Sequence, residues 1–163
     1  MTGPAGAAEQ VHRQLLRRRA TLAVAESLTG GLLCAALTDL AGASSVVRGG
    51  VVAYATPLKA LLLGVPEELL ASRGAVDPDV AAAMAAGART RLGATYGVAT
   101  TGVAGPSPQD GKPVGTVYVA VATPHGERVA GHRFGGDRAA VRAAATEAAL
   151  GLLLAILDEG ETA

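Results

Sequence analysis

Three short polar segments carry side chains that could do chemistry, and each follows an apolar run. The segment 26–31 places a serine hydroxyl beside two glycines. The segment 54–59 places a phenol five residues before an amine, and the segment 100–106 combines two threonine hydroxyls with two glycines. Together these groups could bind an anion, and the serine could act as a nucleophile.

The chain also favours arginine strongly over lysine. It contains twelve arginines and only two lysines, Lys59 and Lys112. An arginine side chain keeps its charge at any ordinary pH, whereas a lysine amine can lose its proton. Lys59 is therefore a candidate base, although a lysine lying by chance on a helix fits the same count.

Each polar segment has a purely structural interpretation as well. Ser27 and Thr29 could cap the helix that follows them. Tyr54 could lie at the edge of the core with its hydroxyl in water, and the glycines of the third segment could serve only a turn. Arg138 and Arg142, one helical turn apart, could form a solvated face. From the residues alone, the sequence indicates an anion-binding domain and no definite reaction.

The elements that must position these side chains follow from the hydrophobic pattern. Helices are expected over residues 8–19, 32–40, 58–63, 66–72, 77–92 and 137–157, and strands over 21–25, 49–55, 96–101, 115–123 and 127–134. The last two strands form a hairpin, which predicts an α/β fold with a mixed β-sheet and helices packed on its faces. We expect a single compact domain over residues 1–163, frayed at about 1–8 and 158–163. All three polar segments follow strands, where open α/β sheets bind ligands.

Composition excludes several classes of protein. One cysteine, Cys34, and three histidines without metal-ligand spacing predict neither a disulfide framework nor a metal or cofactor. Zero net charge and four aromatic residues argue against nucleic-acid binding. No apolar run, including Ala148–Leu157, reaches the roughly 18 residues of a membrane span, and the first residues lack a signal peptide. We therefore expect a cytoplasmic protein without a nucleic-acid or membrane partner, and its alanine-rich helices are compatible with a homo-oligomer.

Longer blocks of the sequence resemble one known family. In order, the chain contains A-E-S-L-T-G-G at 25–31, A-G-A-S at 41–44, G-V-V-A-Y at 50–54, Lys59, G-V at 64–65, G-A-V at 74–76, T-G-V-A-G-P at 101–106, K-P-V-G-T-V at 112–117 and G-G-D-R at 135–138. These blocks resemble the CinA C-terminal domain family of competence/damage-inducible proteins, the nicotinamide mononucleotide deamidases. The resemblance runs from about Val11 to Leu157. The sequence has no counterpart of the molybdopterin-binding-like domain of longer relatives, so we expect the stand-alone form.

The resemblance implies a reaction, an amidase activity and a mechanism. The small-molecule substrate would be nicotinamide mononucleotide, whose carboxamide is hydrolysed to nicotinic acid mononucleotide and ammonia in NAD recycling, without metal or cofactor. By its place in the matching blocks, Ser27 would be the nucleophile and Lys59 the base, a serine–lysine dyad, with Tyr54 bonding the amine or relaying the proton. Whether Lys59 or Tyr54 takes the Ser27 proton stays open.

Substrate-binding residues are also implied, in the turns and in the last helix. They are Thr29, Gly30, Gly31, Thr101, Gly102, Gly105, Arg138 and Arg142. Backbone N–H groups of residues 29–31 would hold the oxyanion, and Arg138 would pair with the phosphate, with Arg142 as the next candidate. The alternative is a non-catalytic nucleotide-binding or regulatory module of the same fold, although a sensor needs no nucleophile and base.

Overall fold

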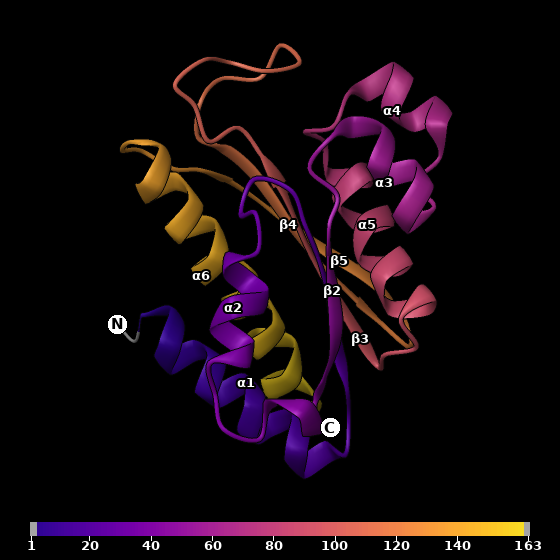
Figure 1. Ribbon diagram of the computed structural model, residues 1–163, viewed down its shortest axis with the longest axis vertical. Coiled ribbons are helices and arrows are strands. Elements are labelled where there is room, and N and C mark those ends of the chain that lie inside the picture. The colour runs from indigo at the N-terminus through magenta and orange to yellow at the C-terminus, as the bar shows by residue number, and fades with distance from the viewer. Residues whose placement is uncertain (1–2, 162–163) are drawn as a thin grey trace.

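A mixed sheet separates two helical layers (Figure 1). Within residues 3–161, which the computed structural model describes, the strands are β1 (Leu22–Glu26), β2 (Val47–Val52), β3 (Tyr96–Gly102), β4 (Thr116–Thr123) and β5 (Gly126–Arg133). The helices are α1 (Pro4–Arg18), α2 (Leu32–Thr38), α3 (Thr56–Leu63), α4 (Glu67–Arg73), α5 (Pro78–Arg91) and α6 (Arg138–Glu161), with a 3₁₀ turn η1 (Ala43–Ser45). The α/β class, the mixed sheet and the helices on its faces are thus confirmed.

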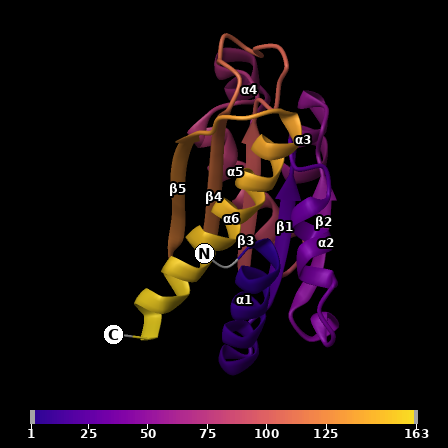
Figure 2. The ribbon, with the colours of Figure 1, turned by 90° about the vertical axis from the view of Figure 1, so that its left-hand side faces the viewer.

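The strand order brings three carboxyl ends to one edge of the sheet. The order is β2-β1-β3-β4-β5, which Figure 2 shows behind α1 and α6. Strand β1 pairs in parallel with both β2 and β3, whereas β3–β4 and β4–β5 are antiparallel. The chain therefore leaves β1, β2 and β3 at the same edge, which is where ligands bind in open α/β sheets.

Two apolar clusters fix this sheet between the helices. On one face, α1, α2 and α6 pack on the sheet around Val24, Val98 and Leu153, all of which are buried. On the other face, α3, α4 and α5 pack around Leu63 and Met84. Strand β1 is buried along its whole length, because both of its faces are covered. The first polar segment thus begins at the end of the most enclosed strand.

The ends of the chain are more regular than the pattern predicts. Helix α1 begins at Pro4, a favoured first helical residue, and Ala7 and Ala8 are buried. Helix α6 continues to Glu161. Fraying is therefore wrong for residues 4–8 and 158–161, while residues 1, 2, 162 and 163 lie outside the described part of the chain.

Helix α6 also corrects one expectation about apolar length. Residues 138–160 are long and apolar enough to cross a membrane by length and composition alone. The apolar residues of α6 pack in the core of the domain, where Val141, Leu150, Leu153 and Leu157 are buried. In this fold α6 packs with α1 and α2 on one face of the sheet.

Candidate active site

A cavity of about 300 Å³ opens where β1, β2 and β3 end. Its walls are the segments that follow these strands, together with residues 75–76 and Arg138 from the start of α6. A backbone bond from the Ser27 N–H to the Thr100 carbonyl ties the first wall to β3, and one from the Ala53 N–H to the Glu26 carbonyl ties β1 to the second. The three polar segments predicted from the sequence therefore meet at one site.

Ser27 and Lys59 are in direct contact in this site. The Lys59 Nζ lies 3.0 Å from the Ser27 Oγ, 2.7 Å from the Ala53 carbonyl oxygen and 3.3 Å from the Tyr54 carbonyl oxygen. Lys59 is fully buried, on the inner face of α3, and Ser27 is 8% exposed in the cavity wall. Pro57 near the start of α3 and a left-handed Gly64 at its end delimit the short helix that carries the amine.

The surroundings of the amine shift its protonation equilibrium toward the neutral form. Burial lowers the pKa of Lys59 from 10.5 to about 8, because an ammonium loses hydration there, and the negative charge of Asp110 opposes this shift. A neutral amine has two hydrogens and one lone pair. With the hydrogens donated to the two carbonyls, the lone pair is left for the Ser27 hydroxyl.

Tyr54 lies apart from this pair. Its phenol is exposed at the cavity rim, where its oxygen accepts a hydrogen bond of 2.9 Å from Arg138. Only its backbone carbonyl reaches Lys59. The structure therefore does not bring the phenol to the amine, and the expected relay through Tyr54 has no contact to carry it.

Arg138 stands at the mouth of the cavity. Besides the phenol of Tyr54, its guanidinium donates to the Gly105 carbonyl at 2.8 Å. The two bonds hold the side chain across the cavity, from α6 to the loop after β3. Its position fits the predicted role as a substrate-binding residue, because a guanidinium has further donors to offer an anion.

The beginning of α2 is closed by a buried carboxylate that sequence reasoning missed. The Glu26 carboxylate accepts hydrogen bonds from the backbone N–H groups of Gly31, Leu33 and Cys34. The Gly30 N–H bonds to the Ser27 carbonyl. Neither Gly30 nor Gly31 lines the cavity, so the expectation that their N–H groups hold an oxyanion is wrong. The signal was the glutamate at the end of an otherwise apolar strand.

The side chains expected to cap α2 have other partners. The Thr29 Oγ1 lies 2.8 Å from the Thr100 Oγ1, and both threonines are fully buried. The N-cap residue of α2 is Gly31, and no side chain caps it in the usual way. The capping interpretation of Ser27 and Thr29 is therefore wrong.

Arg142 contacts the main chain of the first polar segment, residues 26–31, and is not part of the cavity wall. Its Nε donates to the Leu28 carbonyl at 3.0 Å, and its Nη2 donates to the Thr29 carbonyl at 3.2 Å. It is absent from the cavity lining, whereas Arg138 is part of it. Of the two arginines, only Arg138 is placed to meet a ligand.

The residues of the third segment line the cavity but serve the fold first. The Thr101 hydroxyl donates to the Ala75 carbonyl at 2.7 Å. A side chain at Gly102 would meet the Thr116 carbonyl oxygen at 2.6 Å, and Gly105 has a left-handed φ of +91°. These glycines are required by the chain's own path, as the structural interpretation of them predicted.

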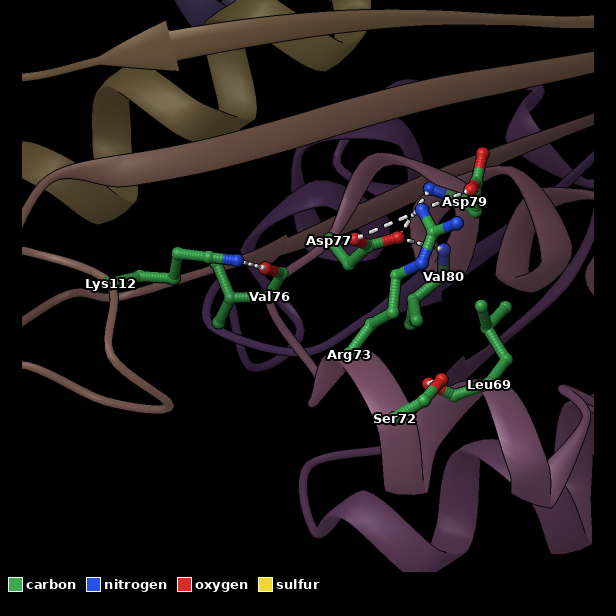
Figure 3. Close-up of polar contacts among 8 residues, drawn as sticks. All are labelled: Leu69, Ser72, Arg73, Val76, Asp77, Asp79, Val80 and Lys112. Atoms are coloured by element: carbon green, nitrogen blue, oxygen red, sulfur yellow. Dashed lines mark hydrogen bonds and ion pairs between the residues drawn. The ribbon is translucent and has the colours of Figure 1, made fainter.

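The wall formed by residues 75–76 is held from two sides (Figure 3). The Asp77 carboxylate caps α5 by accepting from the N–H groups of Asp79 and Val80, and Arg73 pairs with both aspartates. From the loop after β3, Lys112 donates to the Val76 carbonyl at 3.2 Å. Asp110, in the same loop, accepts from the Ala75 N–H. The second lysine of the chain is thus a loop anchor.

The family model and the similar proteins all indicate the same family. A family model described as the CinA C-terminal domain matches residues 5–157. A CinA-like protein from Frankia casuarinae is 58% identical over 143 residues, 88% of this chain and 33% of that protein. A putative competence-damage inducible protein from Desulforamulus reducens is 49% identical over 86% of this chain and 34% of its own length. The chain spans about a third of these relatives.

Solved structures match over nearly the whole chain. A competence-damaged protein (CinA) superfamily protein from Klebsiella pneumoniae has a TM-score of 0.93 and 34% identity, with 97% of this chain and 99% of that chain covered. The competence/damage inducible protein CihA from Agrobacterium tumefaciens has a TM-score of 0.91 and 37% identity, with 97% of each chain covered. The fold described above is the fold of these proteins.

Proposed function

The chain belongs to the CinA C-terminal domain family, and from this premise we propose that it hydrolyses the carboxamide of nicotinamide mononucleotide. The products are nicotinic acid mononucleotide and ammonia. A cytoplasmic location and a role in NAD recycling belong to the same proposal.

The observation that carries the proposal is the contact between Ser27 and Lys59. A buried amine 3.0 Å from a serine hydroxyl, with its pKa lowered to about 8, is suited to accept the hydroxyl proton at neutral pH. A solvated lysine would be almost fully protonated there. In the ammonium form the Lys59 Nζ also donates to the Ser27 Oγ. Once that proton is lost, the two backbone carbonyls accept the remaining hydrogens and the lone pair faces the Ser27 hydroxyl.

The reaction follows from this geometry in two halves. The Ser27 Oγ attacks the carboxamide carbon while its proton moves to the Lys59 Nζ. The C–N bond then breaks, and the same proton leaves with ammonia. In the second half, a water molecule gives a proton to Lys59 and attacks the acyl carbon, and the C–O bond to Ser27 breaks as the serine regains its proton. The two halves consume one water molecule and release one ammonia.

The size of the cavity and the arginine in its wall are consistent with a compact anionic substrate. Its volume of about 300 Å³ lies at the lower end of the range for small-molecule sites. Arg138 lines the same cavity as Ser27, with its guanidinium 2.8 Å from the Gly105 carbonyl, and is the arginine that we propose meets the phosphate of the nucleotide. A bidentate arginine–phosphate pair would fix the orientation of the nucleotide.

The test is ammonia release from nicotinamide mononucleotide by the wild-type protein and by Ser27→Ala. We expect release by wild type and its loss in the folded variant. Ser72→Ala is the matched control, because that hydroxyl is exposed on α4 and bonds only the Leu69 carbonyl. Nucleotide binding without ammonia release by wild type would instead support the non-catalytic nucleotide-binding module.

A further inference from the structure

The cavity wall contains polar side chains that have no partner in the protein. Four of its polar side chains are already bonded, namely those of Ser27, Tyr54, Thr101 and Arg138. Within residues 3–161, no protein group bonds the side chains of the remaining three, which are Thr56, Ser107 and Gln109. These three are neutral, so Arg138 is the one charged side chain among the described residues that line the cavity.

Gln109 belongs to a tight turn in the loop after β3. The main chains of Gln109 and Lys112 exchange two hydrogen bonds, one of 2.8 Å from the Lys112 N–H and one of 3.1 Å from the Gln109 N–H. Between them, Asp110 and Gly111 have φ values of +51° and +72°. A type I′ turn requires positive φ at both central residues, and Asp-Gly is a favoured pair for it. The backbone of the turn therefore fixes the position of Gln109.

Two side chains of the turn hold it against the cavity wall. The Asp110 carboxylate accepts from the Ala75 N–H at 3.1 Å, and the Lys112 ammonium donates to the Val76 carbonyl (Figure 3). Ala75 and Val76 both line the cavity. Residues directly opposite each other in an antiparallel pair place their side chains on the same face. Gln109 is therefore on the face of the turn from which Lys112 reaches the wall.

We propose that Gln109 is a specificity-determining residue that recognises the ribose of the substrate through hydrogen bonds between its amide and the ribose hydroxyls. The inference rests on the proposed function. In that function the carboxamide lies at Ser27 and the phosphate at Arg138, so the ribose that joins them meets the neutral part of the wall. A glutamine amide offers both donors and an acceptor, and a hydroxyl group both donates and accepts.

The exposure of Gln109 sets the size of the expected effect. Because Gln109 is exposed, its amide exchanges bonds to water for bonds to the ligand, and the net gain from such an exchange is modest. The ribose hydroxyls take no part in breaking the C–N bond. The same contacts are therefore present before and during the reaction, so their loss should weaken binding and leave the chemical step unchanged.

The experiment compares wild type with Gln109→Ala on nicotinamide mononucleotide and on its 2′-deoxy and 3′-deoxy analogues. We expect the variant to raise KM for the nucleotide about three- to tenfold, with kcat unchanged. Wild type should lose the same factor on at least one deoxy analogue, and the variant should lose nothing further on that analogue.

Two further variants make this comparison specific. The bonds that close the turn are between main-chain atoms, so alanine at position 109 should leave it intact. Gln109→Met keeps the length of the side chain and removes the amide, and it serves if the alanine variant does not fold. Gln10→Ala is the matched control, because Gln10 lies on α1, outside the lining of this cavity, and should keep the wild-type selectivity.

A binding measurement separates this inference from the proposed reaction. If wild type releases no ammonia from the nucleotide, the proposed function fails, and calorimetric titration with nicotinic acid mononucleotide and its two deoxy analogues decides the inference. Wild type should then bind the ribonucleotide about three- to tenfold more tightly than at least one analogue, and Gln109→Ala should bind those two equally. A wild-type protein that binds none of the three overturns the inference as well.

Three other results would overturn it. One is an unchanged KM and an unchanged affinity in the folded Gln109 variants. Another is a loss in Gln109→Ala that is equal on the nucleotide and on both deoxy analogues, which would place the amide against the base or the phosphate. The last is a fall in kcat on all three substrates, which would place Gln109 at the carboxamide.

Discussion

The burial of Lys59 against Ser27 predicts a specific dependence of the reaction rate on pH. With a pKa of about 8, the amine is neutral in about 1% of molecules at pH 6, about 9% at pH 7 and about 90% at pH 9. A lysine with the usual pKa of 10.5 would be neutral in about 0.03% at pH 7. Burial therefore increases the active fraction at pH 7 about 300-fold.

The expected profile is a single rising limb with its midpoint near pH 8. At saturating substrate, ammonia release should increase about tenfold between pH 7 and pH 9 and then level off. Lys59→Arg keeps a positive charge but supplies no neutral amine, so it should be nearly as inactive as Lys59→Ala. The profile is measured in buffers of constant ionic strength, with Ser72→Ala as the control that should reproduce the wild-type midpoint.

Two results would refute this reasoning. A rate that is flat between pH 6 and pH 9 would mean that no group with the pKa of Lys59 controls the reaction. An arginine variant that keeps most of the activity would reduce Lys59 to an electrostatic anchor for Ser27. Proton transfer would then have to pass through a bound water, because the phenol of Tyr54 contacts Arg138 and not the dyad.

Four further predictions concern Asp110, Lys59, Arg138 and metal ions. The negative charge of Asp110 opposes the lowering of the Lys59 pKa. Asp110→Asn removes this charge, so the pKa of Lys59 should fall further and the midpoint of the rate profile should move to lower pH. Because the pKa of Lys59 is lower in the folded than in the unfolded state, thermal stability should rise with pH between about 8 and 10.5, and Lys59→Met should lose that rise. Arg138→Ala should raise KM for the nucleotide several-fold and leave the riboside almost unaffected; equal losses on both would remove Arg138 from the phosphate. Activity should survive exhaustive chelation, since residues 3–161 hold no cluster of three metal-ligating side chains, and recovery with one divalent ion after a loss would contradict this.

The order of elements could be predicted because residues typical of helix starts, helix ends and turns separate the apolar segments. Asp77-Pro78 marks the start of α5, Gly64 ends α3, and the short connection at residues 124–126 requires a hairpin. The strand order could not be obtained in this way, because periodicity does not say which strands pair. The chain ends were mispredicted for a related reason, since Ala7 and Ala8 are ordered by burial against the rest of the core.

The site was predictable only in part. The residue types and the family blocks identified Ser27 and Lys59, and the structure brings their side chains together at 3.0 Å. The glutamate at the end of an apolar strand was the one signal that its carboxylate would fill the start of α2, and no pattern indicated that Arg142 would bind carbonyls. The Glu26 contacts are local and depend on how the chain turns from β1 into α2, whereas the Arg142 contacts join residues more than 100 positions apart and depend on how α6 packs against that turn.

The anchoring of Lys59 by main-chain carbonyls has an evolutionary consequence. A substitution at Tyr54 changes the side chain at the cavity rim, yet the main-chain oxygens of residues 53 and 54 that hold the amine remain available. The same is true of Leu28, whose main-chain groups do not depend on the identity of its side chain. Side chains in the cavity wall can therefore change by substitution while the contacts that hold Lys59 beside Ser27 stay the same.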